Sequence, residues 1–185
     1  MITRRLFLGA TSSYSILAAT SVSAHHGTPV PEKFKPQNVR FTGYPAGRII
    51  IDRSKFFLYW TLPNGRARRY GVGLGRAGLQ LSGTTRIAYK AKWPSWTPTP
   101  AMIRRNPGRY KRWANGMPGG KGNPLGARAL YLYRNGRDTY FRIHGTTEPW
   151  SIGSNASNGC VRMINDHVID LYNRVPNGTR VTVIS

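Results

Sequence analysis

The chain has 185 residues, of which 28 are Lys or Arg and 6 are Asp or Glu, so its formal net charge is +22. This length suits one domain, and 39% hydrophobic and 11% aromatic residues supply enough apolar surface for a core, which excludes wholesale disorder. The single Cys excludes an intramolecular disulfide and a cysteine-cluster metal site, while 21 Gly and 13 Pro favour strands and loops over long helices.

Residues 1–24 have the features of an export signal. Arg4 and Arg5 precede a modest apolar stretch, and residues 22–24 (Val-Ser-Ala) form a small-residue cleavage site. The apolar stretch is too short and too interrupted by Ser and Thr to span a membrane. The Arg pair is typical of twin-arginine export, and an ordinary secretory signal is the alternative. We therefore expect cleavage near Ala24, a periplasmic protein and no stable membrane anchor.

Residues 25–47 are polar and rich in Pro, which predicts a linker or a loosely packed N-terminal arm. His25 and His26 lie at its start, where we expect a frayed end rather than a metal site. Residues 48–185 contain no internal repeat and no sign of a second boundary. They are expected to form one domain.

Short apolar segments bounded by turn residues predict a mainly β domain. In chain order, the expected strands cover residues 48–51, 55–60, 68–74, 86–93, 129–134, 137–143 and 179–184. The Asn-Gly pair at 135–136 tolerates the positive φ angles of a type I′ turn, so the two strands beside it should pair directly.

One helix is predicted near the C-terminus. Its apolar face follows the spacing i, i+3, i+4, i+7 through Val168, Leu171, Tyr172 and Val175. Asn165 is the candidate N-cap, and the Pro-Asn-Gly sequence at 176–178 ends the helix.

Between Trp93 and Gly126 the periodicity is lost. The segment holds six of the 13 prolines, three Trp and one Tyr. A loop of this length in a compact domain is usually functional or disordered, and its Trp content argues against disorder. We expect an ordered cover over a site; the alternative is that Trp93, Trp96 and Trp113 fill the edge of the core.

Cys160 is a lone thiol in a chain with an export signal, so it is either a small buried hydrophobe or a nucleophile. The residues before it, 157–159 (Ser-Asn-Gly), favour the second reading. They are polar and flexible, and backbone amides in such a turn converge on an oxyanion. Arg162 lies two residues further on and favours the thiolate.

A cysteine nucleophile needs a base, and His144 is the candidate. It ends a predicted strand and is followed at once by Gly145, so its ring should project into a cleft. The Gly145 carbonyl is placed to fix its tautomer. From spacing alone, a Cys160–His144 pair is the favoured arrangement.

The same residues resemble the signature of the L,D-transpeptidase catalytic domain, the YkuD-like family. That signature is a His, a spacer, then Ser/Thr-His-Gly-Cys with a common Arg two residues on. Here it is carried by residues 143–146, 151–153 and 157–163. Weaker similarity adds residues 51–59, 116–120, 123–130 and 178–181, so that the resemblance covers roughly residues 47–185.

The resemblance implies a β-sandwich or barrel-like domain with a short C-terminal helix and a long loop rich in Trp, Pro and Gly. It implies that Cys160 attacks a peptidoglycan tetrapeptide stem, that His144 relays the proton, and that amides near Gly159 hold the oxyanion. An amine on a neighbouring stem then gives a 3→3 cross-link. Attack of water on the thioester would instead make the enzyme an L,D-carboxypeptidase. Attack by an amine of an envelope protein would attach that protein to the wall. No metal or organic cofactor is implied.

The chain departs from the family at Asn158, where a second His is usual. Asn158 still donates hydrogen bonds, so we expect it to support the thiolate or the oxyanion, but it cannot carry a proton as His does. Arg162 is the candidate clamp for a stem carboxylate, with a plain surface role as the alternative. Ser157 is expected to orient the loop, and Trp93 and Trp96 to cover the stem.

The charge suggests a rival function. No acidic residue lies between Asp52 and Asp138, an interval that holds 18 Lys and Arg, so nucleic acid is a conceivable partner. The export signal, the dispersed basic residues and the Cys–His pair argue against a nucleic-acid partner. They favour a carboxylate-rich wall substrate instead. A non-catalytic wall-binding protein is a further alternative, kept open by Asn158.

Overall fold

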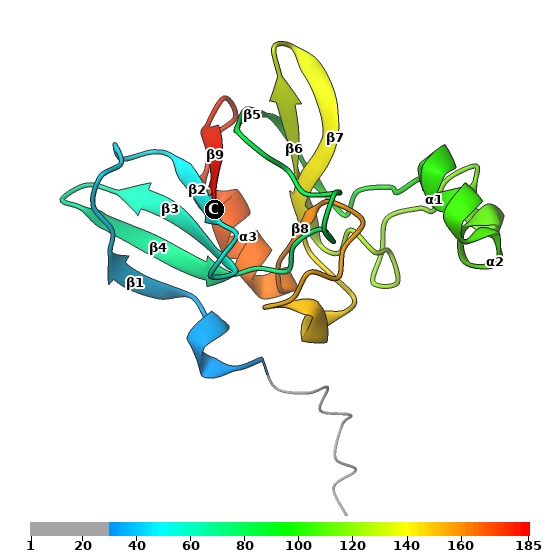
Figure 1. Ribbon diagram of the computed structural model, residues 1–185, viewed down its shortest axis with the longest axis horizontal. Coiled ribbons are helices and arrows are strands. Elements are labelled where there is room, and N and C mark those ends of the chain that lie inside the picture. Colours follow the sequence, from blue (N-terminus) through cyan, green and yellow to red (C-terminus); the bar gives the residue numbers. More distant parts are fainter. Residues whose placement is uncertain (1–29) are drawn as a thin grey trace, which may run out of the picture.

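The computed structural model describes residues 30–185; the export signal predicted in residues 1–24, together with His25 and His26, lies outside the described residues. Within the described part, the strands form one nine-stranded mixed sheet in the order β1-β4-β3-β2-β9-β5-β6-β7-β8 (Figure 1). The strands are β1 (Gln37–Arg40), β2 (Ile49–Asp52), β3 (Phe57–Leu62), β4 (Arg66–Gly71), β5 (Thr84–Lys92), β6 (Arg128–Arg134), β7 (Arg137–His144), β8 (Val161–Arg162) and β9 (Arg180–Ile184).

The mainly β fold class and all seven expected strands are confirmed, with ends that differ by at most three residues. β1 and β8 were not expected. Most neighbours in the sheet are antiparallel, but β2 pairs with β9 and β7 with β8 in parallel. The parallel β7–β8 pair matters for function, because it brings the segment after Gly159 beside the end of β7.

The core lies between the sheet and α3 (Asn165–Arg174), which Figure 1 shows between the β1–β4 half and the β5–β7 half of the sheet. Strand alternation divides the three isoleucines of β2 between two faces. Ile49 and Ile51 belong to the main core, whereas Ile50 belongs to a smaller cluster on the other face. Val168, Leu171 and Val175 are buried in the main core, as the helical spacing predicts.

The predicted helix is confirmed, but its predicted cap is wrong. The N-cap position is Ile164, which makes no side-chain cap bond. Asn165 is the first helical residue, and its amide joins two loops instead. Its Oδ1 accepts a hydrogen bond from the Ala127 N–H at 2.9 Å, and its Nδ2 donates to the Thr146 carbonyl at 3.3 Å.

Residues 25–47 were expected to be a linker or a loosely packed N-terminal arm, and the described part, residues 30–47, is an arm that packs against the sheet. A 3-10 turn, η1 (Glu32–Phe34), leads into β1, which pairs with β4. Phe34 is buried, and a Cβ on Gly71 or on Gly153 would collide with its side chain. The arm is packed because its aromatic residue fills space that these two glycines leave open.

Residues 93–126, called the cover segment below, are ordered, as expected from their Trp content. They contain α1 (Pro100–Arg105), α2 (Pro107–Tyr110) and the 3-10 turn η2 (Lys111–Trp113), which lie beyond the β7 side of the sheet (Figure 1). Thr99 and Asn106 cap the two short helices, each through a side-chain oxygen. No helix within residues 30–185 has the length and apolar character needed to cross a membrane.

Candidate active site

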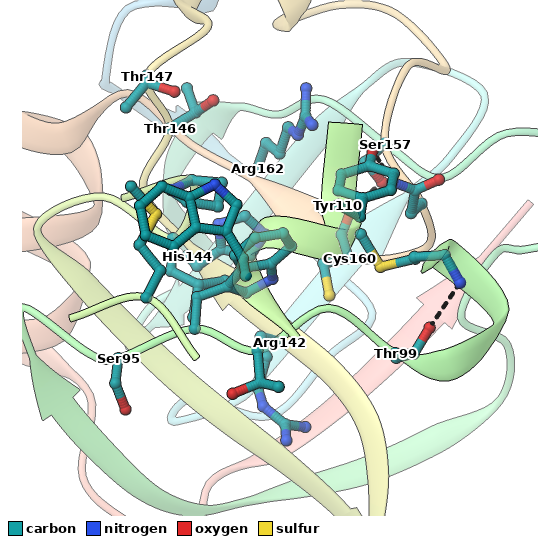
Figure 2. A pocket seen from close by; sticks show the side chains of 18 of the residues that line it. Ser95, Thr99, Tyr110, Arg142, His144, Thr146, Thr147, Ser157, Cys160 and Arg162 are labelled. Atoms are coloured by element: carbon teal, nitrogen blue, oxygen red, sulfur yellow. Dashed lines mark hydrogen bonds between the residues drawn. The ribbon is translucent and has the colours of Figure 1, made fainter. Parts of the chain in front are cut away.

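A cavity of about 510 Å³ separates the cover segment from the ends of β7 and β8, and we call it the Cys160 cavity. Cys160 and His144 both line it, together with residues of the cover segment (Figure 2). Its lining also includes aromatic, charged and polar side chains: Trp96, Met102, Arg109, Tyr110, Arg112, Trp113, Met117, Tyr131, Tyr140, Arg142, Glu148, Ser157, Asn158 and Arg162.

His144 is the last residue of β7, and strand alternation turns it toward the same face as Arg142. Only 4% of His144 is exposed, and its Nδ1 lies 2.5 Å from the Gly145 carbonyl oxygen. Because a carbonyl only accepts, Nδ1 carries the hydrogen and Nε2 is left as an acceptor. Burial, reinforced by Arg162 and Arg142, lowers the pKa of His144 to about 4. The ring is therefore neutral at pH 7.

Cys160 reaches the same place through the β7–β8 pair, in which Ile143 lies opposite Val161. Its Sγ lies 3.8 Å from the Tyr140 carbonyl oxygen. Burial raises the pKa of the thiol, although Arg142 and Arg162 act in the opposite direction. Arg162 favours the thiolate, as expected, but the cost of burying the charge is larger, so the thiol is the resting form. The resting pair is a thiol and a neutral imidazole, which suits proton transfer during attack.

The loop before Cys160 is held by Ser157. The Ser157 Oγ donates to the Cys160 carbonyl at 2.6 Å and accepts the Gly159 N–H at 3.0 Å. The Gly159 amide, expected to bind an oxyanion, is thus already used, whereas the Cys160 N–H has no hydrogen-bond partner among residues 30–185. Gly159 has φ 133°, and a Cβ there would lie 2.9 Å from the Leu79 carbonyl, so the turn requires glycine.

Arg162 is not a free surface residue. Its side chain is 14% exposed and donates to the Glu148 Oε2 at 2.6 Å. The other oxygen of Glu148 accepts from Arg109 of α2 at 3.1 Å. Burial alone would raise the pKa of Glu148, but the two guanidinium groups lower it. Glu148 therefore links the strand after Cys160 to the cover segment.

Asn158 makes a second link to the cover segment. Its Nδ2 donates to the Tyr110 hydroxyl at 3.3 Å, and its Oδ1 accepts from Arg105 at 3.4 Å. Within the described residues it makes no hydrogen bond to Cys160. Support of the thiolate by Asn158 stays a prediction, and the contacts made by its amide lead away from the sulfur.

The structure brings Trp96 but not Trp93 to the cavity. Trp96 packs edge-on against Tyr110 with ring centroids 6.0 Å apart. Trp93 is 44% exposed at the end of β5 and is absent from the lining. Met102, Trp113 and Met117 line the cavity as well.

Arg142 and Glu148 line the cavity but were not among the predicted site residues. Arg142 was detectable, because it precedes His144 by two residues and so shares its strand face. Glu148 was detectable as the only acid between Asp138 and Asp166 in a very basic chain. Within residues 30–185, no three His, Cys, Asp or Glu side chains gather in a way that would hold a metal ion.

Comparison with known sequences agrees with this geometry. The family model described as the L,D-transpeptidase catalytic domain (YkuD) matches residues 46–183. The ErfK/SrfK protein of Escherichia coli K12, described as a probable L,D-transpeptidase, is 33% identical over 139 residues, which cover 74% of this chain and 43% of that protein. The YqjB protein of Bacillus subtilis 168 is 44% identical over 137 residues, which cover 73% and 69%. The chain thus spans less than half the length of ErfK/SrfK.

Solved structures give the same fold. A Brucella melitensis protein, described as a probable carnitine operon oxidoreductase, is 55% identical with a TM-score of 0.59, covering 84% of this chain and 96% of its own. The Enterococcus faecium L,D-transpeptidase catalytic domain acylated by ertapenem is 17% identical with a TM-score of 0.54, covering 77% of this chain and 100% of its own. Since the family model covers the whole segment that carries Cys160 and His144, the chain belongs to the family of L,D-transpeptidase catalytic domains.

Proposed function

We propose that this protein is a periplasmic, cysteine-dependent L,D-transpeptidase that acts on tetrapeptide stems of peptidoglycan. The observation that carries the proposal is one cavity lined by the chain's only thiol, Cys160, and by a buried neutral imidazole, His144. A nucleophile and a base in one cleft are the two groups that acyl transfer through a thioester needs.

In the proposed acylation, the Cys160 Sγ attacks the carbonyl carbon of the third stem residue while the thiol proton passes to Nε2 of His144. The tetrahedral oxyanion is stabilised by the Cys160 N–H, which is otherwise unpaired within the described residues. The intermediate collapses when the bond to the terminal D-Ala breaks. The imidazolium returns its proton to the leaving amine, and a Cys160 thioester remains.

The second half-reaction releases the thioester to an amine. A side-chain amine of a neighbouring stem attacks the thioester carbonyl and His144 takes one amine proton. The C–S bond then breaks, and the leaving Cys160 thiolate takes that proton from His144, which regenerates the thiol. The product is a 3→3 cross-link. The cover segment supports amine attack over hydrolysis, because it shields the cavity and so limits bulk water. Water or an amine of an envelope protein are the alternative acceptors.

The charge of the cavity supports a carboxylate-rich substrate. Arg109, Arg112, Arg142 and Arg162 line it, against the single carboxylate of Glu148 within the described lining. Stem peptides carry several carboxylates, so the excess of guanidinium groups provides complementary charge. Arg162 remains the proposed clamp for a carboxylate of the donor stem. Glu148 already accepts from Arg162, so the donor carboxylate would compete with it there.

The test supplies purified protein with disaccharide-tetrapeptide and measures products by mass spectrometry. Transpeptidation predicts 3→3 dimers that increase with acceptor concentration, and no product from Cys160→Ala. Tripeptide as the main product at every acceptor concentration would overturn the cross-linking assignment and leave a carboxypeptidase. Neither product, with Cys160 still acylated by ertapenem, would favour a protein acceptor.

A further inference from the structure

β7 is irregular next to the site. Tyr131 lies opposite Arg142 and Tyr133 opposite Asp138, so residues 139–141 bulge out opposite the single residue Leu132. At the centre of the bulge, Tyr140 has φ 60°, which a bulky residue adopts only where its surroundings hold it. Tyr140 is also 74% exposed, so packing of its ring does not stabilise this backbone conformation.

Two neighbouring side chains hold the bulge. Asp138 Oδ1 accepts the Tyr140 N–H at 2.8 Å, which fixes the strained peptide directly. The same carboxylate accepts a hydrogen bond from each terminal nitrogen of Arg142, both at 2.7 Å. Thr139 Oγ1 donates to the Leu132 carbonyl at 2.5 Å and accepts the Phe141 N–H at 3.2 Å, which closes the bulge.

The bulge faces the thiol. It aims the Tyr140 carbonyl at Cys160, where the Sγ–H donates to it across 3.8 Å. It also fixes Arg142, whose guanidinium lies 4.3 Å from the ring centre of Tyr131. Figure 2 shows Arg142 and Arg162 on opposite sides of the Cys160 sulfur. Bulges beside active sites commonly redirect groups in this way.

We propose that Asp138 is a positioning residue for Cys160. Asp138 accepts the Tyr140 N–H and so fixes the Tyr140 carbonyl, which orients the thiol. It also binds the Arg142 guanidinium and so holds this cation beside Cys160. The effect of Asp138 on thiol geometry does not depend on the proposed function, whereas its effect on turnover rests on the proposed function of Cys160. Asp138 itself touches no reacting atom.

Charged and titratable groups surround Cys160 on several elements. Asp138 and Arg142 of β7 and Arg162 of β8 act on the pKa of the thiol, and His144, Arg109, Arg112 and Glu148 line the same cavity. Tyr110 of α2 and Tyr131 of β6 also line the cavity around the thiol. A substitution of Asp138 therefore changes one negative charge and the position of one positive charge, and the test below separates the two.

The test compares Asp138→Ala with Asp138→Asn in the full chain. Asn keeps an oxygen that accepts the Tyr140 N–H and a hydrogen bond from Arg142, whereas Ala keeps neither. Ertapenem acylation of Asp138→Ala should slow by about tenfold to a hundredfold at saturation, with the half-saturating concentration changed less than about threefold, and Asp138→Asn should recover most of the rate.

Iodoacetamide gives a readout that needs no enzyme activity, because Cys160 is the only thiol. The thiolate sulfur forms a bond to carbon, iodide leaves, and the rate against pH gives the pKa of the thiol. Both variants lack the carboxylate, but only Asn retains Arg142 beside Cys160. The pKa of the thiol should therefore be higher in Asp138→Ala than in Asp138→Asn.

Two further variants keep the result interpretable. Thr139→Val removes the hydroxyl bonds of the bulge without a change of charge and should also slow acylation. Arg174→Ala breaks the other i,i+4 Asp–Arg pair, Arg174 with Asp170 at 2.7 Å on α3, and should change neither readout.

Equal thiol pKa values in the two Asp138 variants would overturn the proposal, as would acylation of both Asp138→Ala and Thr139→Val within about twofold of wild type. If ertapenem does not acylate the wild type, the proposed function fails, while the iodoacetamide comparison still decides the role of Asp138.

Discussion

Glu148 sits between two arginines, one from each side of the Cys160 cavity, and its replacement by Gln removes the charge while keeping the shape. Glu148 Oε2 accepts from Arg162 at 2.6 Å, and both of these side chains are largely buried. Glu148 Oε1 accepts from Arg109 at 3.1 Å, and the Arg109 side chain is 60% exposed. The two contacts should therefore contribute unequally.

The buried contact dominates the expected loss. A hydrogen bond to a charged group is worth about 1.5–3 kcal/mol, whereas an exposed ion pair such as that with Arg109 contributes about 0.2–1 kcal/mol. Gln retains an accepting oxygen, so we expect Glu148→Gln to lower the free energy of unfolding at pH 7 by about 1–2 kcal/mol. For a chain of this size, that is a fall in Tm of roughly 2–8 °C.

The effect should depend on pH with a defined sign. The pKa of Glu148 is lowered in the folded state, so its carboxylate stabilises the fold above the ordinary Glu pKa of about 4.3. That contribution is lost as the pH falls through the lowered folded-state pKa. The stability difference between wild type and Glu148→Gln should therefore be full at pH 7 and shrink toward zero in acid.

Urea unfolding from pH 7 down to pH 3 measures this difference. Glu32→Gln is the matched control, because Glu32 pairs with Lys35 at 2.5 Å with both side chains more than half exposed. It should change stability by less than about 0.5 kcal/mol at any pH. A loss in Glu148→Gln that is as small as in the control, or that is the same at pH 3 and pH 7, would refute this account of the cavity.

Three other predictions concern the base, the loops around it and the surface. Because the pKa of His144 is about 4, the rate of Cys160 acylation by ertapenem should fall only as the pH drops through about 4; stopped-flow fluorescence that places this limb near 6.5 would contradict a buried neutral base. Asn165→Ala should lower the free energy of unfolding by about 1–3 kcal/mol in urea, since the Ala127 amide and the Thr146 carbonyl lose their partner, and an unchanged midpoint would contradict this. Sedimentation with isolated sacculi should weaken as salt is added, because cleavage near Ala24 removes Arg4 and Arg5 and leaves a formal net charge of +20, which binds anionic walls through screened attraction; a salt-independent curve would assign binding to specific contacts.

Much of the fold was predictable because its signals are local. Apolar segments and turn residues are read from a few neighbouring positions, and they located seven strands and the C-terminal helix. β1 and β8 escaped, since β1 (Gln37–Arg40) is polar and β8 (Val161–Arg162) has two residues. Their pairing depends on distant partners, β4 and β7, which a local pattern does not reveal.

The reactive pair of the site was predictable, because few residues of this chain can serve as a nucleophile or a base. A lone thiol and a His before a glycine identified Cys160 and His144. The state of the thiol was not predictable, because burial of Cys160 outweighs the charge of Arg162, and burial is a property of the fold. The role of Asn165 was misjudged for a similar reason: its amide binds segments 38 and 19 residues away rather than its own helix.

Trp93 and Trp96 illustrate the same limit within one segment. Both are aromatic residues of the cover segment, and composition treats them alike. The fold ends β5 just before Trp93 and leaves it exposed, while the Trp96 backbone pairs with Met117 and its ring lies in the cavity. Only the path of the chain distinguishes them.

The central claim, a thioester on Cys160, is tested most directly by intact-protein mass spectrometry of the acid-quenched reaction with disaccharide-tetrapeptide. The account predicts an adduct with the mass of the donor less its terminal D-Ala, located on Cys160, absent in Cys160→Ala, and depleted when acceptor amine is added. An adduct on another residue, or product formed by Cys160→Ala at a rate within about tenfold of wild type, would contradict it.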